Sequence, residues 1–385
     1  MKRILTLLTT LVACCFGYAQ SVDVHHSGIL SSYSADELQE ISLEHDATGS
    51  TVSILKYGET PLRTDAANVT AISFSDQPVD ASTKYADGEP AQVVFSCIEV
   101  NNTNPLQHLN FHLKKSNKNL FDAVILFSSN INFSKKEDVV YIHNNENVQP
   151  ILNHWEHYIK PLKDRGIKVL LSILGNHDGS GLANLSDERA KLFAQAIADT
   201  LQKYDLDGVF FDDEYSDYNK NLAGQGYKGF FSTASYDAAS RLAYETKQAI
   251  GDKWLVLYKY GSYSKAVSVD GKKPGEYVDY VLTDYNVSGA GMNLQYPGVE
   301  NSQVGCYSVN INGYYNKSNI KKLRSEKYGA FMIYNLDQTA YDFSYSKLIN
   351  LESFVDYLFD DELEVTETLY RKDWEPIEEL KEPNR

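Results

Sequence analysis

The sequence contains few cysteine, methionine and tryptophan residues, and its acidic residues outnumber its basic ones. Among 385 residues there are 4 Cys, 3 Met and 3 Trp, and 36 Lys and Arg stand against 52 Asp and Glu. The cysteines form no CxxC or Cys/His spacing, which excludes a disulfide framework and a zinc motif. The formal net charge of −16 disfavours nucleic acid and anionic membranes, because both select a basic surface, so neither is expected as a partner.

The apolar run that opens the chain is short. Two basic residues precede it, it covers residues 4–13, and small residues follow at positions 17 and 19. Such a run cannot span a bilayer permanently and predicts a cleaved export signal over residues 1–20. The mature protein would then be periplasmic, cell-surface or secreted. An alternative interpretation treats Leu11-Val12-Ala13-Cys14 as a lipoprotein box, with Cys14 lipidated and the protein tethered to a membrane.

The remaining composition is that of a folded soluble protein. Hydrophobic residues make up 43% and charged residues 23%, which argues against disordered, collagen-like and polytopic membrane classes. Tyrosine is abundant, with 28 copies beside 16 Phe. Amphipathic rings suit the faces and hydroxyls of sugars, so a neutral ligand fits this acidic, tyrosine-rich chain better than a polyanion does.

The first part of the chain differs in pattern from the rest. Residues 21–88 are polar and rich in turns, with short alternating runs, and they predict a small β-rich segment to which no function is assigned. From residue 89 onward, short apolar runs predict eight buried strands. These runs are Val93–Val100, Ala123–Phe127, Val169–Leu174, Gly208–Phe211, Trp254–Tyr260, Val278–Leu282, Val304–Tyr307 and Ala330–Tyr334.

Helices with a 3.6-residue hydrophobic period separate several of these strands. One is expected over residues 148–162, a second begins after the N-cap Ser186, and a third runs over about 235–250 and stops at Gly251. Strands that alternate with helices imply parallel pairing, and eight of them predict an α/β fold of the (β/α)8 TIM-barrel class.

We expect this barrel to occupy residues 89–359. The connections after its first and fifth strands lack a clear helical pattern, so the helical ring is expected to be incomplete. Residues 360–385 are rich in charge and are expected to form a tail on the surface.

An apolar strand that ends in three consecutive carboxylates is the most informative segment. It reads Leu206-Asp207-Gly208-Val209-Phe210-Phe211-Asp212-Asp213-Glu214-Tyr215. Because side chains alternate along a strand, Asp212 and Glu214 share one face and Asp213 points to the other. The two carboxylates would meet at the C-terminal mouth of the barrel, where barrel enzymes keep their chemistry. Repulsion between like charges is expected to hold Glu214 protonated as an acid while Asp212 stays ionised.

Two other interpretations of this cluster are open. One is a solvated acidic turn, which the buried strand before it makes weaker. The other is a Mg²⁺ or Ca²⁺ site, which clustered Asp and Glu suit. No EF-hand spacing surrounds the cluster and no second acidic strand end is obvious, so neither a metal nor another cofactor is expected. Asp207 and Asp213 are expected to be structural, Asp207 through bonds to nearby backbone.

Further polar side chains are expected at the same mouth. Glu99 ends the first strand, Asn176 and His177 follow the third, and Asn335 follows the eighth. Each is a candidate to line a ligand site. A loop histidine is more often structural than catalytic, so His177 is expected to contact a substrate at most, and Glu99 is equally well explained as a surface carboxylate.

The acidic strand resembles the active-site signature D-G-x-D-x-D-x-E of glycoside hydrolase family 18. It is close to the version in the bacterial endo-β-N-acetylglucosaminidases typified by endoglycosidase H, and further stretches resemble that subgroup in strand order. A plain chitinase is a weaker fit, because the matched stretches are those of the endoglycosidase subgroup. They are Ile98–Asn102, Asn130–Asn132, Asn145–Gln149, Lys168–His177 and Tyr334–Asp337.

The resemblance implies an enzyme that hydrolyses the β-1,4 bond between the two core N-acetylglucosamines of N-linked glycans or glycoproteins. Glu214 would be the general acid and then the base, while the substrate's own 2-acetamido oxygen attacks C1 to form an oxazolinium intermediate. Asp212 would hold the acetamido N–H and stabilise the developing positive charge. Tyr285 would place a hydroxyl near the acetamido group, and Tyr334 with Asn335 would contact the glycan.

The chain departs from the family pattern at Phe210, where the signature has its middle Asp. Loss of that carboxylate removes a charge that could share a proton with Asp212 or reorient it. The alternative is therefore a catalytically weak glycan-binding protein, a chitinase-like lectin, on the same barrel. Retention of both Asp212 and Glu214 favours the enzyme. The sequence assigns no oligomeric partner.

Overall fold

The computed structural model divides into two compact units, residues 1–83 and residues 84–385. No helix in the part of the chain that it describes is long and apolar enough to cross a membrane. The described residues are 21–26, 29–34, 38–45, 50–56, 62–66, 69–75, 92–116, 118–284, 291–311, 313, 315–337, 348–366 and 368–374.

The first unit consists of two three-stranded antiparallel sheets. β1 (Ser21–His26) pairs with β2 (Ile29–Ser34) and β6 (Val69–Ser75), and β4 (Ser50–Lys56) pairs with β3 (Leu38–His45) and β5 (Leu62–Asp65). The small β-rich N-terminal segment that the sequence predicts is confirmed. Its core is formed by apolar residues of β1, β3 and β4, which are Val22, Val24, Leu38, Ile41, Val52 and Ile54.

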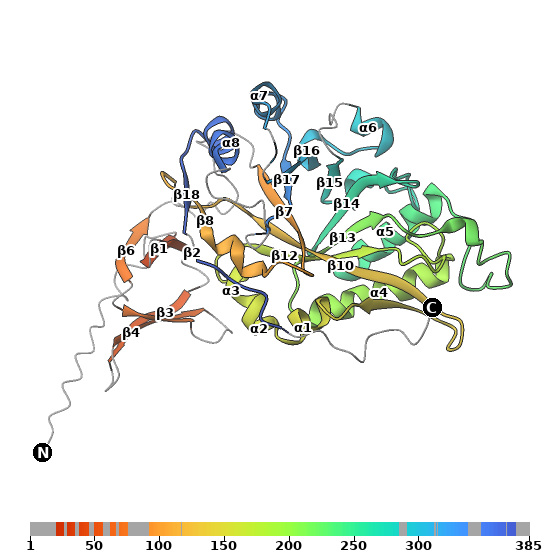
Figure 1. Cartoon of the computed structure of the whole chain (residues 1–385), viewed down its shortest axis with the longest axis horizontal. Coiled ribbons are helices and arrows are strands. Elements are labelled where there is room, and N and C mark those ends of the chain that lie inside the picture. The colour runs from red at the N-terminus through yellow and green to blue at the C-terminus, as the bar shows by residue number, and fades with distance from the viewer. Residues whose placement is uncertain are drawn as a thin grey trace, which may run out of the picture. The chain divides into compact units, whose positions relative to one another are not determined.

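The second unit is a closed barrel of eight parallel strands (Figure 1). Each strand pairs with the next in chain order, and β17 returns to pair with β7, so no barrel strand is left at an edge. The predicted (β/α)8 barrel is confirmed. Its strands are β7 (Val93–Glu99), β10 (Ala123–Ser134), β12 (Lys168–Leu174), β13 (Gly208–Asp213), β14 (Trp254–Gly261), β15 (Tyr280–Thr283), β16 (Val304–Asn310) and β17 (Ala330–Tyr334).

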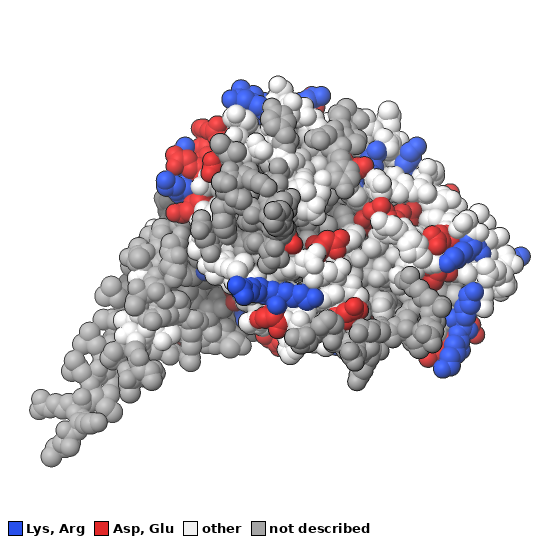
Figure 2. All heavy atoms as spheres, viewed as in Figure 1, with Lys and Arg blue, Asp and Glu red and all other residues white. Residues whose placement is uncertain are grey.

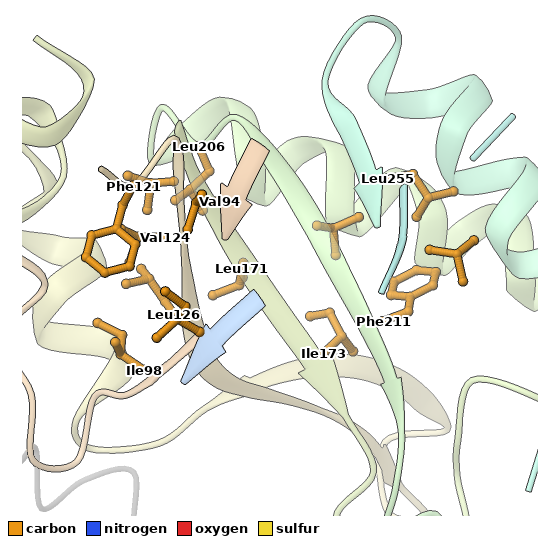
Figure 3. Close-up of a cluster of buried hydrophobic side chains, with 14 of the residues drawn as sticks. Val94, Ile98, Phe121, Val124, Leu126, Leu171, Ile173, Leu206, Phe211 and Leu255 are labelled. Atoms are coloured by element: carbon orange, nitrogen blue, oxygen red, sulfur yellow. The ribbon is translucent and has the colours of Figure 1, made fainter. Parts of the chain in front are cut away.

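Side chains along the barrel strands alternate between the interior and the outer face. Strand residues that point outward, such as Val124, Leu171 and Phe211, belong to the larger of two hydrophobic cores (Figure 3). That outer core also contains helix residues such as Phe193 and Ile197. The parity of a strand residue therefore decides whether it faces the barrel axis or the helices. The interior set is Phe95, Ala123, Ile125, Leu170, Phe210, Val256, Leu282, Ala330 and Met332.

The helices form an incomplete ring, as the sequence predicts. Within the described residues, the only helices in the connections after β7 and β14 are the 3-10 helices η2 (Pro105–Asn110) and η4 (Pro274–Glu276). Two more short 3-10 turns are η3 (Tyr218–Lys220) and η5 (Asn301–Gln303). The α-helices are α1 (Val148–Asn153), α2 (Trp155–Tyr158), α3 (Lys160–Lys163), α4 (Asp187–Lys203), α5 (Tyr236–Ile250), α6 (Met292–Gln295), α7 (Lys317–Ser325) and α8 (Ile349–Phe359).

The ends of the two longest helices follow the capping signals in the sequence. Ser186 accepts a hydrogen bond from the Arg189 backbone N–H at the start of α4, and Ser235 accepts one from Ala238 at the start of α5. Gly251 ends α5 with a φ of 61°, which glycine adopts at low cost. α4 and α5 pack side by side (Figure 1). α4 contacts β13, which carries the acidic cluster, and α5 contacts the next strand, β14.

The helix expected over residues 148–162 is instead broken into α1, α2 and α3. Pro161 explains the second break, because it has no N–H to donate to the carbonyl oxygen of His157 and its ring crowds that carbonyl. The apolar positions still face the core, since Ile151, Ile159 and Leu162 are buried. The hydrophobic period thus predicted the buried face correctly but not the continuity of the helix.

Three pairings of strands lie outside the sequence prediction. β11 (Val139–Asn144) folds back on the extended end of β10 as an antiparallel hairpin. β18 (Leu363–Val365) pairs with β8 (Phe111–Leu113), which also pairs with β9 (Lys118–Asn119).

The segment that the sequence assigns to a surface tail therefore contributes a strand to the second unit. Asp361 and Trp374 in this segment are buried. Local sequence patterns could not predict these contacts, because the partners of β18 lie about 250 residues earlier in the chain.

Charged side chains lie in mixed groups on the surface drawn in Figure 2, where Lys and Arg are interspersed with Asp and Glu. Several pair over one helical turn, as Lys160 does with Asp164 at 2.6 Å and Lys322 with Glu326 at 3.5 Å. Exposed pairs of this kind contribute about 0.2–1 kcal/mol each to stability. The two apolar layers therefore account for most of what holds the barrel together.

Asp361 is a buried carboxylate that fixes the turn after β8. It is 4% exposed and accepts hydrogen bonds from the backbone N–H groups of Lys115 at 2.7 Å and Ser116 at 2.9 Å. Burial acts to raise its pKa, yet these bonds and one from the Glu362 backbone lower the pKa below its usual value. The ionised form is therefore the one that stabilises the fold.

Replacement of this carboxylate should weaken the barrel. Asp361→Ala is expected to lower the free energy of unfolding by about 1–3 kcal/mol at pH 7, because buried backbone donors lose their acceptor. Since the folded pKa is depressed, the deficit should shrink as the pH falls below about 4. Urea unfolding followed by circular dichroism checks both. Glu362→Ala, whose side chain is 55% exposed, is the control, and an equal loss in both variants would contradict the role of Asp361.

Candidate active site

Strand β13 carries the acidic cluster to the mouth of the barrel. Asp212 follows Phe210 at the same parity and faces the barrel axis, together with Glu214. Asp213 points the other way, where it accepts hydrogen bonds from the Tyr218 hydroxyl, from Ser216 Oγ at 3.3 Å and from the Tyr263 backbone N–H at 3.2 Å. The alternation in the sequence thus separates a pair of inward carboxylates from a structural one.

The two inward carboxylates line an open cavity of about 380 Å³ at the C-terminal ends of the strands. Its walls come from β7, β10, β13, β14 and β17 and from the residues that follow them. The described residues that line it are Cys97, Glu99, Phe127, Phe210, Asp212, Glu214, Tyr215, Tyr258, Tyr260, Met332, Tyr334 and Asn335. A cavity with aromatic walls and two carboxylates on one side is suited to a sugar whose bond is to be cleaved.

Asp212 is the more buried of the pair, at 2% exposed. Burial first, and then the neighbouring charges of Glu214 and Asp213, raise its pKa to about 8. Burial also raises the pKa of Glu214, while a side-chain hydrogen bond with Asp212 acts in the opposite direction. Burial and the neighbouring charges therefore favour one proton shared by the pair near neutral pH.

The sequence predicts that Glu214 holds the proton while Asp212 stays ionised. The burial of Asp212 acts against its ionised state, because the apolar interior penalises a charge on Asp212 more than one on the half-buried Glu214. One carboxylate oxygen of Asp212 also makes no hydrogen bond within the described residues. Oδ1 is buried and has no hydrogen-bond partner within the described chain, so it can accept a bond from a ligand.

Phe210 forms the floor beneath this pair. It is 1% exposed and belongs to the interior core with Leu170 and Val256. Its ring centroid lies 5.7 Å from that of Tyr258, which stands on the next strand. An apolar floor supplies neither a charge nor a hydrogen bond to Asp212, so Glu214 is the group that shares its proton.

A third carboxylate, Asp284, follows the end of β15. It accepts a hydrogen bond from the Tyr258 hydroxyl at 3.0 Å, and its charge acts to raise the pKa of both Asp212 and Glu214. Asp284 is therefore an acidic residue at a second strand end that was not obvious from the sequence. The signal was present, because Asp284 directly follows a buried apolar run. Among the described residues, no set of three or more His, Cys, Asp or Glu is arranged to hold a metal ion.

The other predicted site residues fall into three groups. Glu99, Tyr334 and Asn335 line the cavity together with the two carboxylates. Asn176 and His177 are not among its described lining residues, although they lie on the adjoining loop. Tyr285 lies outside the described residues.

The loop of Asn176 and His177 lies beside the cavity. Asn176 donates to Asn132 Oδ1 at 3.2 Å. His177 is exposed, with Nδ1 3.2 Å from Asp217 Oδ1 and its ring centroid 5.2 Å from that of Tyr215. Since Tyr215 does line the cavity, His177 supports a wall of the site from outside.

Three tyrosines of the cavity were missed from the sequence. Tyr258 and Tyr260 stand on one face of β14 with ring centroids 5.8 Å apart and nearly parallel planes. Tyr215 follows Glu214 and is 53% exposed, and Tyr260 is 39% exposed. Large exposed rings at a cavity mouth suit the apolar face of a sugar. The alternation Tyr258-Lys259-Tyr260 at the end of an apolar run was the available signal.

Comparison with known proteins identifies relatives that share most of the chain. The endo-β-N-acetylglucosaminidase F1 of Elizabethkingia meningoseptica is 42% identical over 320 residues, which cover 82% of this chain and 91% of the relative. An endo-β-N-acetylglucosaminidase of Flavobacterium sp. (strain SK1022) is 33% identical over 280 residues, or 71% of this chain and 83% of the relative. No protein-family model matches the sequence.

Solved structures agree with this comparison. The Bacteroides thetaiotaomicron protein EndoBT-3987 with Man5GlcNAc product superposes with a TM-score of 0.67 at 26% identity, over 92% of this chain and 89% of that one. Its complex with a Man9GlcNAc2Asn substrate gives a TM-score of 0.64 at 26% identity, over 89% and 85% of the two chains.

The raised pKa of Asp212 predicts a pH-dependent cost to stability. Its folded pKa of about 8 lies above the usual 3.8, so the folded protein binds more protons than the unfolded chain between these values. Stability should therefore fall as the pH rises from 4 to 8. Asp212→Asn cannot ionise at this position. Its free energy of unfolding minus that of wild type should therefore be larger at pH 8.5 than at pH 4, by on the order of 1 kcal/mol or more.

Thermal and urea unfolding at both pH values measure this difference. Asp199→Asn, on the exposed face of α4, is the matched control and should show no such trend. A stability difference between Asp212→Asn and wild type that is the same at pH 4 and pH 8.5 would refute the raised pKa.

Proposed function

The chain belongs to the endo-β-N-acetylglucosaminidases of glycoside hydrolase family 18, and we propose that it hydrolyses the β-1,4 bond between the two core N-acetylglucosamines of N-linked glycans. The structural relative with a Man9GlcNAc2Asn substrate supports this choice of ligand. The products would be a free glycan that ends in one N-acetylglucosamine and a polypeptide that retains the other. The family resemblance alone does not distinguish turnover from binding, so the site residues carry the argument.

The observation that carries the proposal is the state of Asp212. Its Oδ1 is buried beside Glu214 without a partner among the described residues, and its other carboxyl contact is with Glu214. A substrate acetamido N–H is the kind of donor that such an acceptor requires. Held in this way, the acetamido oxygen would be aimed at C1 of the same sugar, which is the geometry of a substrate-assisted attack.

The shared proton explains how Glu214 could act as the acid. A hydrogen bond from the acetamido N–H favours the ionised form of Asp212, because it stabilises the charge that burial had penalised. The proton then moves along the existing hydrogen bond to Glu214, which faces the cavity. Protonated Glu214 gives it to the leaving glycosidic oxygen, and the carboxylate that remains activates water in the second step.

Asp212 would then stabilise the positive charge of the oxazolinium intermediate. A fixed carboxylate in a poorly solvated site interacts strongly with a developing cation. Water that enters from the same side as the departed group would open the intermediate with net retention at C1. No enzymic nucleophile is needed in this scheme, because the acetamido oxygen of the substrate attacks C1.

A glycan-binding protein without turnover is the second candidate, and Phe210 is the observation that favours it. An apolar floor cannot reorient Asp212 through a second carboxylate. The hydrogen-bonded pair of Asp212 and Glu214 argues for turnover, because proton sharing is already in place. We propose the enzyme as the main function.

We also propose that residues 1–20 hold an export signal that is cleaved after Ala19, because this segment has the composition of a signal sequence. Intact-mass measurement of the protein purified from its own cells tests this. A mass that corresponds to a chain beginning at residue 20 supports a free exported form. A chain that begins at Cys14 and carries the added mass of a lipid supports the lipoprotein form. A mass equal to that of the full chain would contradict export with cleavage.

The function is tested with a denatured N-glycoprotein and mass spectrometry of both products. Wild type is expected to leave one N-acetylglucosamine on each glycosylated asparagine. Glu214→Gln removes the proton donor and should lower the rate by about 10²–10⁴-fold without loss of glycan binding. Glu156→Gln, an exposed replacement of the same chemistry on α2, is the control and should keep the wild-type rate.

Two outcomes would contradict parts of this proposal. If Glu214→Gln turned over at nearly the wild-type rate, Glu214 would not be the acid. If wild type left the glycoprotein mass unchanged but bound a labelled glycan, the protein would be a lectin on the same barrel.

A further inference from the structure

The residue that follows β12, Gly175, lies against the backbone that carries Glu214. Its N–H donates to the carbonyl oxygen of Glu214 at 3.0 Å, and two residues later the His177 N–H donates to the carbonyl oxygen of Tyr215 at 2.8 Å. These bonds join the loop after β12 to the segment after β13, beyond the last paired strand residues, Ile173 and Phe211. The loop after β12 is therefore held against the backbone of Glu214.

Only a residue without a side chain fits at position 175. A Cβ atom built there would lie 2.6 Å from the carbonyl oxygen of Glu214, from the carbonyl carbon of Tyr215 and from the backbone nitrogen of Ser216. Real Cβ atoms essentially never come within 3.0 Å of such atoms. All three contacts are with backbone, so no side-chain rotation can relieve them. The glycine is needed for close approach and not for its φ, which is not positive.

The other side of the acidic segment is restrained one residue earlier. β13 pairs with β14 through Phe211, the register then shifts, and the last pair is Asp213 with Gly261, where a Cβ atom would lie 2.2 Å from the carbonyl oxygen of Asp213. Directly after Glu214 the chain turns sharply, with a φ of 56° at Tyr215 and 45° at Asp217. The contact with Gly175 is therefore the one that acts on the backbone of Glu214 itself.

A second glycine of the same loop approaches the same segment. A Cβ at Gly181 would lie 2.5 Å from both Cβ and Oγ of Ser216 and 2.6 Å from the Tyr218 hydroxyl. The two hydroxyl groups could rotate away, whereas the Cβ of Ser216 is fixed by the backbone. The loop thus closely approaches residues 214–218 at two points, through backbone contacts at Gly175 and side-chain contacts at Gly181.

We propose that Gly175 is a positioning residue, which sets the place of the Glu214 carboxyl group relative to Asp212 and to the bond that is cleaved. This inference rests on the proposed function. A side chain at 175 would push the Glu214 backbone away from β12, and the carboxyl group would move with it. Displacements near 1 Å cost on the order of 100-fold in rate when a proton must be delivered to one atom. Most walls of the cavity, such as Tyr258, Tyr260 and Tyr334, stand on other strands and would stay in place, whereas Tyr215 at the rim would move with Glu214.

The test compares Gly175→Ala with Gly229→Ala. A Cβ atom at Gly229 would meet no other atom within 4 Å, and the φ of this glycine is not positive, so it controls for the chemical change alone. We expect Gly175→Ala to lower kcat about 10–100-fold while KM changes less than about threefold. Gly229→Ala should stay within about twofold of wild type in both. The Kd of a labelled glycan, measured with Glu214→Gln present in each background, should not change.

A purely structural role would give a different pattern. It would lower the melting temperature and leave kcat of the folded fraction unchanged, which would overturn the proposal. If Gly175→Ala does not fold, Gly181→Ala takes its place, with an expected loss in kcat of about three- to tenfold. Wild-type kcat in that variant would also overturn it.

Failure of the proposed function would be seen separately, as wild type that does not cleave the glycoprotein. Crystal structures of wild type and Gly175→Ala then decide the inference. A shift of the Glu214 carboxyl group of more than about 0.5 Å relative to Asp212 would support it, and superposable carboxylates would overturn it.

Discussion

Pairing of β17 with β7 closes the parallel sheet, and the site depends on this closure. An open sheet would present its inward residues as a row, whereas a closed one directs them toward a common axis. Glu99, Asp212 and Tyr334 stand on strands far apart in the sequence and meet for this reason alone. The same closure buries Phe210 and makes the floor of the cavity apolar. That floor in turn raises the pKa of Asp212 and gives the pair its single proton.

The barrel holds these carboxylates at a cost to stability, because burial of a charge without a partner of opposite sign is unfavourable. The structure limits that cost in two ways. Asp212 keeps a proton and shares it with Glu214, and Asp213 is turned away toward donors on Tyr218 and Tyr263. A substrate donor at Asp212 would relieve the remaining cost. Part of the substrate's binding energy would thereby favour the ionisation of Asp212 and the transfer of its proton to Glu214.

Local patterns predicted the features that depend on local physics. The period of two in β13 separated Asp212 from Asp213, and Ser186 and Gly251 marked helix ends through their own backbone bonds. Features that need distant partners were not predicted. β18 pairs with a strand from the start of the barrel, and the close approach of Gly175 depends on the backbone of another strand. The raised pKa of Asp212 was not predicted, because its depth above Phe210 is a property of the closed barrel.

The closing pair has a further consequence for how the chain folds. Val93 pairs with Ala330, which lies 237 positions later, so β7 keeps one unpaired edge until nearly the whole barrel has formed. Such long-range pairing gives a high contact order, and folding should be slow compared with that of a helical domain of similar size. Until closure, the free edges of β7 and β17 offer backbone donors and acceptors to other chains. The interval before closure is the stage at which this protein is most exposed to aggregation.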